Sequence, residues 1–207
     1  MNRPRLLLIG AGGHAHACID VLERHGEYDI AGLIGLPEEL RTVHFCYSVI
    51  GTDDDLPALA DTYRHALIGA GQIRSPELRM RLYRRAVDLG FEMPVIVAPT
   101  AHVSAHAVIG AGTIVMHGAI VNAGARIGSN CIVNTRAVVE HDVSVDDHCH
   151  IATGAILNGH VRVGAGSFVG SGSVVREGVA IGSRCLVGMA SCVRHDQSDH
   201  ARCVGGK

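Results

Sequence analysis

From residue 103 onward, the chain carries a branched aliphatic residue at every sixth position. The register continues without a break through sixteen positions, and the residue four places later is usually small. Such a strict repeat decides the fold before local propensity does. It is typical of a parallel β-helix, in which each hexad forms one side of a triangular coil and its aliphatic residue stacks inward. The sixteen positions are Val103, Ile109, Val115, Val121, Ile127, Val133, Val139, Val145, Ile151, Leu157, Val163, Val169, Val175, Ile181, Val187 and Val193.

The same repeat sets the size of this region. Eighteen residues complete one turn, so the array predicts about five coils and a prism roughly 24 Å long at ~4.8 Å per layer. The composition agrees with a narrow interior, because the 207 residues include no Trp, 3 Phe and 4 Tyr. Cys131, Cys149 and Cys185 are separated by multiples of eighteen, so we interpret them as small buried thiols in one column.

The first half of the chain alternates apolar runs with helix signals. This predicts a Rossmann-like α/β domain with a parallel sheet over residues 1–98, before a β-helix domain over residues 99–207. The first apolar run ends in a glycine-rich turn at residues 10–14, and the helix after it is expected to reach about His25. Glycines and free N–H groups at a helix N-terminus suit a phosphate. The next strand, residues 30–35, ends without the acid that would hold the ribose of NAD.

Further signals complete this domain. Three acids at positions 53–55 indicate a helix start, and residues 66–70 indicate a buried strand ending at Gly71. The Ser75-Pro76 pair predicts a helix from there to about Leu89. That helix carries four arginines, which we interpret as a solvated face: Arg79, Arg81, Arg84 and Arg85.

Charge and composition exclude some classes of partner. The formal net charge is −2, with no basic face for a phosphate backbone, so no nucleic-acid partner is expected. No apolar run approaches the ~20 residues of a membrane span, and the first run is shorter than a secretory signal requires. The 7 cysteines match no CxxC zinc pattern. We therefore expect a reduced, cytoplasmic protein without a metal.

Ionisable residues gather at one expected corner of the prism, at Glu140, His141 and Asp142. An adjacent carboxylate orients an imidazole, fixes its tautomer and raises its basicity, so His141 is the candidate general base and Asp142 its partner. His150 is nine residues further on, half a coil away. We therefore expect a homo-oligomer with the site between prisms and His150 supplied by a neighbour.

These features resemble the left-handed β-helix sugar acetyltransferases of the sialic-acid O-acetyltransferase type, which include UDP-4-amino-sugar (bacillosamine) and GDP-perosamine N-acetyltransferases. The resemblance covers nearly the whole chain. Residues 10–14 look like a GASGH motif, and residues 134–142 (NTRAVVEHD) match the pattern N-T-x-A-x-x-E-H-[DE]. The resemblance implies a homotrimer that uses acetyl-CoA to acetylate the amino group of a nucleotide-linked amino sugar in bacterial surface glycan biosynthesis.

The resemblance also implies roles for single residues. His141 falls on the catalytic base and Asp142 on the acid that raises its basicity. His150 falls on a contact to the acetyl-CoA thioester, and the N–H of Gly159 falls on a contact to the acetyl carbonyl. The remaining implied contacts are Ser171 and Met189 with the rest of acetyl-CoA, and Gly12, Gly13, His14 and Gly71 with the nucleotide sugar.

The sequence departs from the family pattern at two places. Ile34 and Gly35 stand where some UDP-sugar members have paired aspartates, which leaves the nucleotide, and even the presence of one, open. The sequence also ends at residues 204–207, where many members continue with a G-x-P-A-K segment next to CoA. Three other functions remain open too. A hydroxyl acceptor, as in sialic-acid O-acetylation, needs the same base. A zinc hydratase of the γ-carbonic-anhydrase type would need a close histidine pair, found only at His195 and His200. A non-catalytic binding module is the third.

Overall fold

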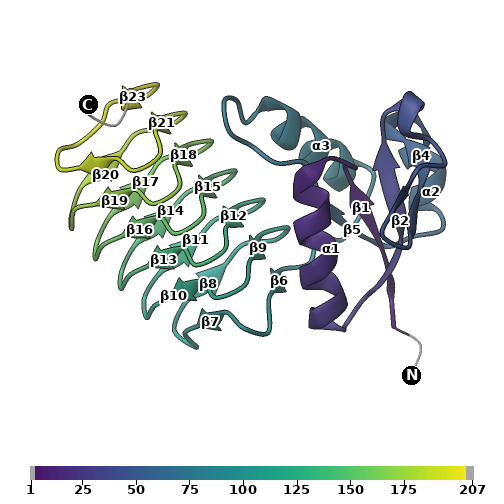
Figure 1. Ribbon diagram of the computed structural model, residues 1–207, viewed down its shortest axis with the longest axis horizontal. Helices are drawn as coiled ribbons and strands as arrows, with labels where there is room; N and C mark the ends of the chain where they lie inside the picture. Colours follow the sequence, from purple (N-terminus) through teal and green to yellow (C-terminus); the bar gives the residue numbers. More distant parts are fainter. Residues whose placement is uncertain (1–2, 204–207) are drawn as a thin grey trace.

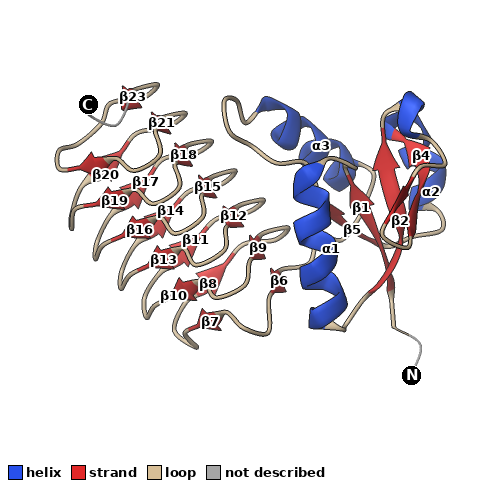
Figure 2. Ribbon diagram, viewed as in Figure 1, coloured by secondary structure: helices blue, strands red, loops and turns tan. Residues whose placement is uncertain are grey.

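The computed structural model describes residues 3–203, which form an α/β domain followed by a long stack of short strands (Figure 1). The last four residues, where the C-terminal departure from the family pattern lies, fall outside this range. Helices occur only in the first half of the described chain (Figure 2). None of the described helices is both long and apolar enough to cross a bilayer.

The N-terminal domain is a five-stranded sheet with the order β3-β4-β2-β1-β5 and with helices on both faces. Its strands pair in parallel, except that β3 and β4 form an antiparallel hairpin. The elements are β1 (Arg5–Ile9), α1 (Gly13–His25), β2 (Asp29–Gly35), η1 (Pro37–Glu39), β3 (Val43–His44), β4 (Tyr47–Thr52), η2 (Asp53–Asp55), α2 (Leu56–Ala60), β5 (His65–Ile68) and α3 (Glu77–Asp88).

Strand β1 shows why both faces of this sheet are covered. Leu6 and Leu8 enter the core beneath α1, whereas Leu7 and Ile9 enter the core beneath α2 and α3. Parallel strands buried on both faces are expected to read as continuous apolar runs. Helix α1 ends at the predicted residue because Gly26 adopts a left-handed conformation (φ 73°) that closes the last turn.

The second half is a left-handed parallel β-helix, which confirms the fold predicted from the hexad repeat. Successive coils pair residues eighteen apart, as Val121 pairs with Val139, and the sheets contain six, five and seven strands. The six-stranded sheet contains β7 (His102–Val103), β10 (Ile120–Val121), β13 (Val138–Val139), β16 (Ile156–Leu157), β19 (Val174–Val175) and β22 (Cys192–Val193). The five-stranded sheet contains β8 (Val108–Ile109), β11 (Arg126–Ile127), β14 (Ser144–Val145), β17 (Arg162–Val163) and β20 (Ala180–Ile181). The seven-stranded sheet contains β6 (Ile96–Val97), β9 (Ile114–Val115), β12 (Ile132–Val133), β15 (His150–Ile151), β18 (Phe168–Val169), β21 (Leu186–Val187) and β23 (Arg202–Cys203).

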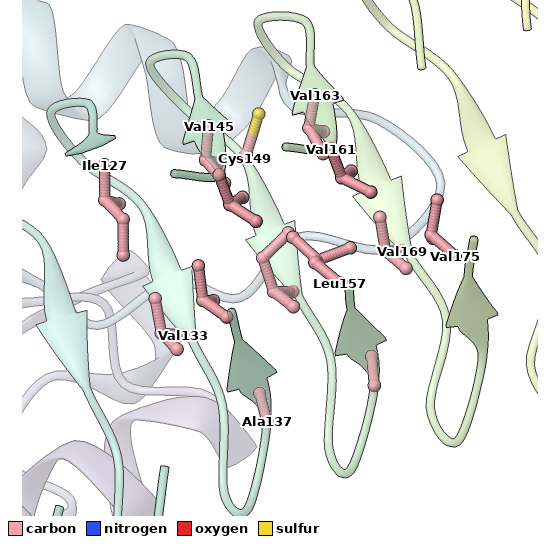
Figure 3. Close-up of a cluster of buried hydrophobic side chains, with 14 of the residues drawn as sticks. Ile127, Val133, Ala137, Val145, Cys149, Leu157, Val161, Val163, Val169 and Val175 are labelled. Atoms are coloured by element: carbon pink, nitrogen blue, oxygen red, sulfur yellow. The ribbon is translucent and has the colours of Figure 1, made fainter. Parts of the chain in front are cut away.

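The prism interior holds the aliphatic residues and little else. Val133, Ile151 and Val169 stack on successive coils of the seven-stranded sheet, and Leu157 stacks on Val175 in the six-stranded sheet (Figure 3). Cys131 and Cys149 are buried in the same core, as the eighteen-residue spacing predicts. Small and branched side chains fill such a prism, which explains the scarcity of aromatic residues in the sequence.

The seven-stranded sheet carries the contact between the two halves of the chain. Strands β6 and β9 of this sheet lie beside α1 (Figure 1). The sheet's outward residues Ile96, Ile114 and Ile132 are fully buried in one core with residues of α1 and β1. These residues also repeat every eighteen positions, but they belong to the outward column rather than the inward one. Docking of the α/β domain on one face of the prism therefore follows from a second periodic pattern.

The reading of Arg79 as part of a solvated face is wrong. Its side chain is fully buried, where Nη1 donates to the carbonyls of Ile68 (2.7 Å) and Ala70 (2.8 Å) and Nε donates to the carbonyl of Asn130 (3.1 Å). Burial lowers the pKa of Arg79 to about 10. The guanidinium donates hydrogen bonds to carbonyls at the end of β5 and at a corner of the prism. These hydrogen bonds link the α/β domain to the β-helix domain.

Candidate active site

The expected pair of a base and a carboxylate lies at the corner that follows β13. His141 Nδ1 and Asp142 Oδ2 are 3.0 Å apart, and both side chains are exposed. This hydrogen bond lowers the pKa of Asp142, with the positive charge of His160 as a smaller cause. With Asp142 ionised, Nδ1 carries the proton and Nε2 is left with a free lone pair. In this tautomer, Nε2 is the nitrogen of His141 that can accept a proton.

Gly159 lies one coil further along, against the far edge of the His141 ring. A Cβ built on Gly159 would lie 2.6 Å from both Cε1 and Nε2 of His141. No side chain fits at this position while the ring keeps its place. Among the described residues, the N–H of Gly159 has no acceptor. A free donor and a free proton acceptor thus lie side by side at this corner.

His160 is a third member of the corner that the sequence reasoning missed. It lies eighteen residues after Asp142, and its Nε2 is 3.9 Å from Asp142 Oδ2. Its ring meets the ring of His141 edge to face at 5.2 Å. Within residues 3–203, these three form the one group of at least three side chains placed to ligate a metal. The alternative zinc pair, His195 and His200, is in no such group among those residues.

The structure does not place His150 beside His141, but against the α/β domain of its own chain. His150 is 6% exposed, its Nδ1 lies 2.6 Å from the Gln72 carbonyl, and its Nε2 lies 3.0 Å from the Asn134 amide nitrogen. Nδ1 is therefore the donor and Nε2 the acceptor. Burial lowers the pKa of His150 to about 4, so the ring is neutral at pH 7. Both nitrogens are already engaged, so a contact with acetyl-CoA would require Asn134 to release Nε2.

The glycine-rich turn opens onto a cavity of about 540 Å³ at the carboxyl ends of β1, β2 and β5. In an open α/β sheet, ligands bind outside these strand ends. All four residues expected to contact the substrate line this cavity: Gly12, Gly13, His14 and Gly71. Burial lowers the pKa of His14 to about 3, with smaller effects from Arg79 and His150, so this ring is neutral too.

Two acidic residues of the cavity were missed. Glu39 and Asp53 line it, although the strand before Glu39 ends without an acid. Asp53 begins η2 after β4, the strand beside β2 in the sheet. The acids approach the glycine turn through tertiary structure, which the spacing in the sequence did not reveal. Glu39 also accepts a hydrogen bond from the backbone N–H of Leu36 at 2.8 Å.

Ser171 and Met189 occupy another corner, the one that joins the seven-stranded sheet to the six-stranded sheet. Both are exposed, and they lie on successive coils. The corner with His141 and Gly159 lies at the opposite edge of the six-stranded sheet, so the face of that sheet connects the two groups. None of these four residues lines the cavity of the α/β domain.

Comparisons with known proteins show which chains this one resembles. Residues 5–86 match the family model described as the PglD N-terminal domain. PerB from Caulobacter crescentus, solved with CoA and GDP-perosamine, is 33% identical, with 99% of this chain and 95% of that chain covered and a TM-score of 0.90. The acetyltransferase domain of PglB from Neisseria gonorrhoeae, solved with acetyl coenzyme A, is 31% identical, with 97% and 96% covered and a TM-score of 0.89.

A more distant structure supports the fold alone. WeeI from Acinetobacter baumannii is 18% identical over 99% of this chain and 97% of that chain, with a TM-score of 0.81. A comparison with curated proteins gave no match. PerB and the PglB domain are both more than 30% identical to this chain and cover nearly all of it, so the chain belongs to the hexapeptide-repeat sugar acetyltransferases. The protein is therefore an acyltransferase of the class that the corner at His141 indicated.

Proposed function

We propose that the protein transfers the acetyl group of acetyl-CoA to the amino group of a nucleotide-linked amino sugar. One observation carries this proposal: His141 is paired with Asp142 at 3.0 Å, beside a glycine that leaves the Nε2 edge open. The similar structures support the substrates, because one holds acetyl coenzyme A and another holds CoA with GDP-perosamine. The pathway that fits is the synthesis of a bacterial surface glycan.

The reaction follows from the arrangement at the corner. His141 Nε2 removes a proton from the sugar amine as the nitrogen attacks the thioester carbonyl, so that a C–N bond forms. The N–H of Gly159 stabilises the oxyanion, the C–S bond then breaks, and the CoA thiolate takes the proton back from His141. General-base catalysis contributes ~10²–10⁴-fold to the rate, and one oxyanion donor contributes about 10²–10³-fold. Asp142 stabilises the imidazolium between the two proton transfers.

The remaining predicted contacts divide between the two substrates. The nucleotide sugar is assigned to the cavity of the α/β domain, where the N-terminus of α1 and its glycines suit the phosphates. No acidic residue occupies the first turn of α1, although Glu39 and Asp53 line other parts of the same cavity. Acetyl-CoA is assigned to the prism, with Gly159, Ser171 and Met189 as backbone contacts. His150 can contact acetyl-CoA through Nε2 only if the hydrogen bond from Asn134 to that nitrogen is broken.

A homotrimer would bring these two sites together. Neither the base nor the assigned CoA contacts line the cavity of the same chain, so the site needs a surface from another copy. The outward residues of the six-stranded sheet include Ile120 and Val174, which are 38% and 37% exposed. Val138 and Ile156 continue this apolar column and are partly exposed. This face carries the proposed contact between subunits, next to the corner with His141.

The proposal is tested by measuring acetylated product with acetyl-CoA and a panel of acceptors. The panel holds UDP-, GDP- and dTDP-linked amino sugars, the matching free amino sugars, and sialic acids. We expect turnover with a nucleotide-linked amino sugar and none with the free sugars. Turnover of sialic acid alone would establish the O-acetyltransferase alternative, and no turnover with any acceptor would contradict the proposed activity.

A further inference from the structure

The corner at His141 holds one more ligating side chain than acetyl transfer uses. We propose that His141, Asp142 and His160 form a binding site for a zinc-class divalent cation, and that the bound cation switches the transferase off. The binding half of this inference stands on geometry alone. The switching half rests on the proposed function, because it assumes that His141 is the base.

The distances fit a tetrahedral ion. Asp142 Oδ2 lies 3.0 Å from His141 Nδ1 and 3.9 Å from His160 Nε2, and one ligand atom from each of the three residues lies within 4.8 Å of the others. Zn²⁺ binds nitrogen and oxygen at about 2.0–2.2 Å, which puts neighbouring ligand atoms about 3.4 Å apart. All three side chains are exposed, so small rotations bring them to this spacing.

The backbone holds the three residues in place. Asp142 and His160 take the same left-handed corner position on successive coils, with φ values of 59° and 60°. The N–H of His160 donates to the carbonyl of His141 at 3.1 Å, and the N–H of Asp142 donates to the coil below in the same way. The spacing of the ligands is therefore set by the β-helix rather than by a loop.

The donor set selects the class of ion. Two imidazoles and one carboxylate suit Zn²⁺ and its late transition-metal neighbours, whereas Mg²⁺ and Ca²⁺ prefer oxygen ligands. Three protein ligands leave the fourth position of a tetrahedral ion to water. The proposed ion is a ligand at the surface and not a part of the acetyl-transfer reaction.

A bound metal ion would prevent His141 from acting as a base, whichever of its two ring nitrogens coordinates the ion. On Nε2 the ion takes the lone pair that must receive the proton of the amine. On Nδ1 the ion displaces the proton from that nitrogen, and a neutral ring must then carry its proton on Nε2. Nε2 becomes a donor in this tautomer and accepts nothing. Binding therefore stops general-base catalysis without any change of fold.

Calorimetric titration of Zn²⁺ into the metal-free, untagged protein tests the binding half. We expect one site per chain in the wild type and a dissociation constant at least ~10-fold higher in His160→Asn, because loss of even an outer-shell partner costs 10–100-fold. Asn tolerates the left-handed position that His160 occupies, so this variant should fold. His106→Asn removes an exposed histidine from the first coil and is the matched control. Equal zinc affinity in His160→Asn and the wild type would overturn the site.

The switching half is tested by product formation, measured by mass so that free thiols do not interfere. We expect Zn²⁺ at its dissociation constant to halve the wild-type rate and a chelator to restore it, while His160→Asn keeps most of its own zinc-free rate. Zinc binding at this corner with an unchanged wild-type rate would overturn the switch. Absence of turnover in metal-free protein would count against the proposed function, and the calorimetry would still decide the metal site.

Discussion

The substitution Gly159→Ala tests whether His141 is the base, because the added methyl group would displace the His141 ring without changing a group that exchanges protons. The added Cβ would lie 2.6 Å from His141 Nε2, whereas ordinary contacts of this kind begin at about 3.4 Å. The exposed ring must therefore move by close to 1 Å. A misplacement of about 1 Å can cost ~10²-fold in rate, so we expect kcat to fall about 100-fold. The N–H of residue 159 is retained, so the oxyanion contact is not the part removed.

Stability should hardly change in this variant, because the ring that yields is exposed and the φ of Gly159 is not left-handed. Gly178→Ala is the matched control one coil further along. It has open space around its Cβ but a φ of 72°, so it should cost ~1 kcal/mol of unfolding free energy and leave kcat unchanged. Full activity in Gly159→Ala would refute the placement of the base. A loss in His141→Asn/Gly159→Ala no greater than in His141→Asn would support it, because both changes act through one ring.

Three further predictions follow from the same structure. His141→Ala should lose at least ~10²-fold in kcat with an unchanged elution volume in gel filtration, and a normal rate would contradict the proposed mechanism. Arg79→Met removes the donor from the buried carbonyls of Ile68 and Asn130, at about 1–3 kcal/mol each, and from the part-buried carbonyl of Ala70. The urea midpoint should therefore fall sharply, and an unchanged midpoint would contradict the role of Arg79 in joining the domains. The pKa of His150 is lowered from 6.5 to about 4, so the unfolded chain takes up a proton that the folded chain does not. Unfolding free energy should therefore fall by up to ~1.4 kcal/mol per pH unit from pH 6.5 toward pH 4, and urea unfolding of His150→Asn should show a shallower slope.

The sequence predicted the fold because the inward column of the prism tolerates few residue types. It did not predict how the α/β domain docks, because docking depends on the outward column, where any residue is compatible with the coil. Ile96, Ile114 and Ile132 were nevertheless a signal, since they are apolar at a spacing of eighteen residues. Arg79 also carried one: it lies three and seven residues before Leu82 and Ala86, on the buried face of α3.

The site was predicted where chemistry depends on neighbours in the sequence. His141 and Asp142 are adjacent, and the hydrogen bond between them follows from that adjacency. His160 was missed although the repeat places it directly over Asp142, because the eighteen-residue period was applied to the core and not to the corners. Asp53 could not be found in this way, since it reaches the cavity through the pairing of β4 with β2.

The three faces of the prism share an aliphatic interior and differ in the residues that point outward. These outward residues explain where the proposed site lies. One column is apolar and is covered by the chain's own α/β domain through Ile114 and Ile132. A second is mixed, since it carries exposed Arg126 and Arg162 together with exposed Val108. The third is apolar yet uncovered, and it lies between the corner with His141 and the corner with Ser171 and Met189. An apolar, uncovered face is what the proposed contact between subunits would bury, and the proposed base and CoA contacts lie along its two edges.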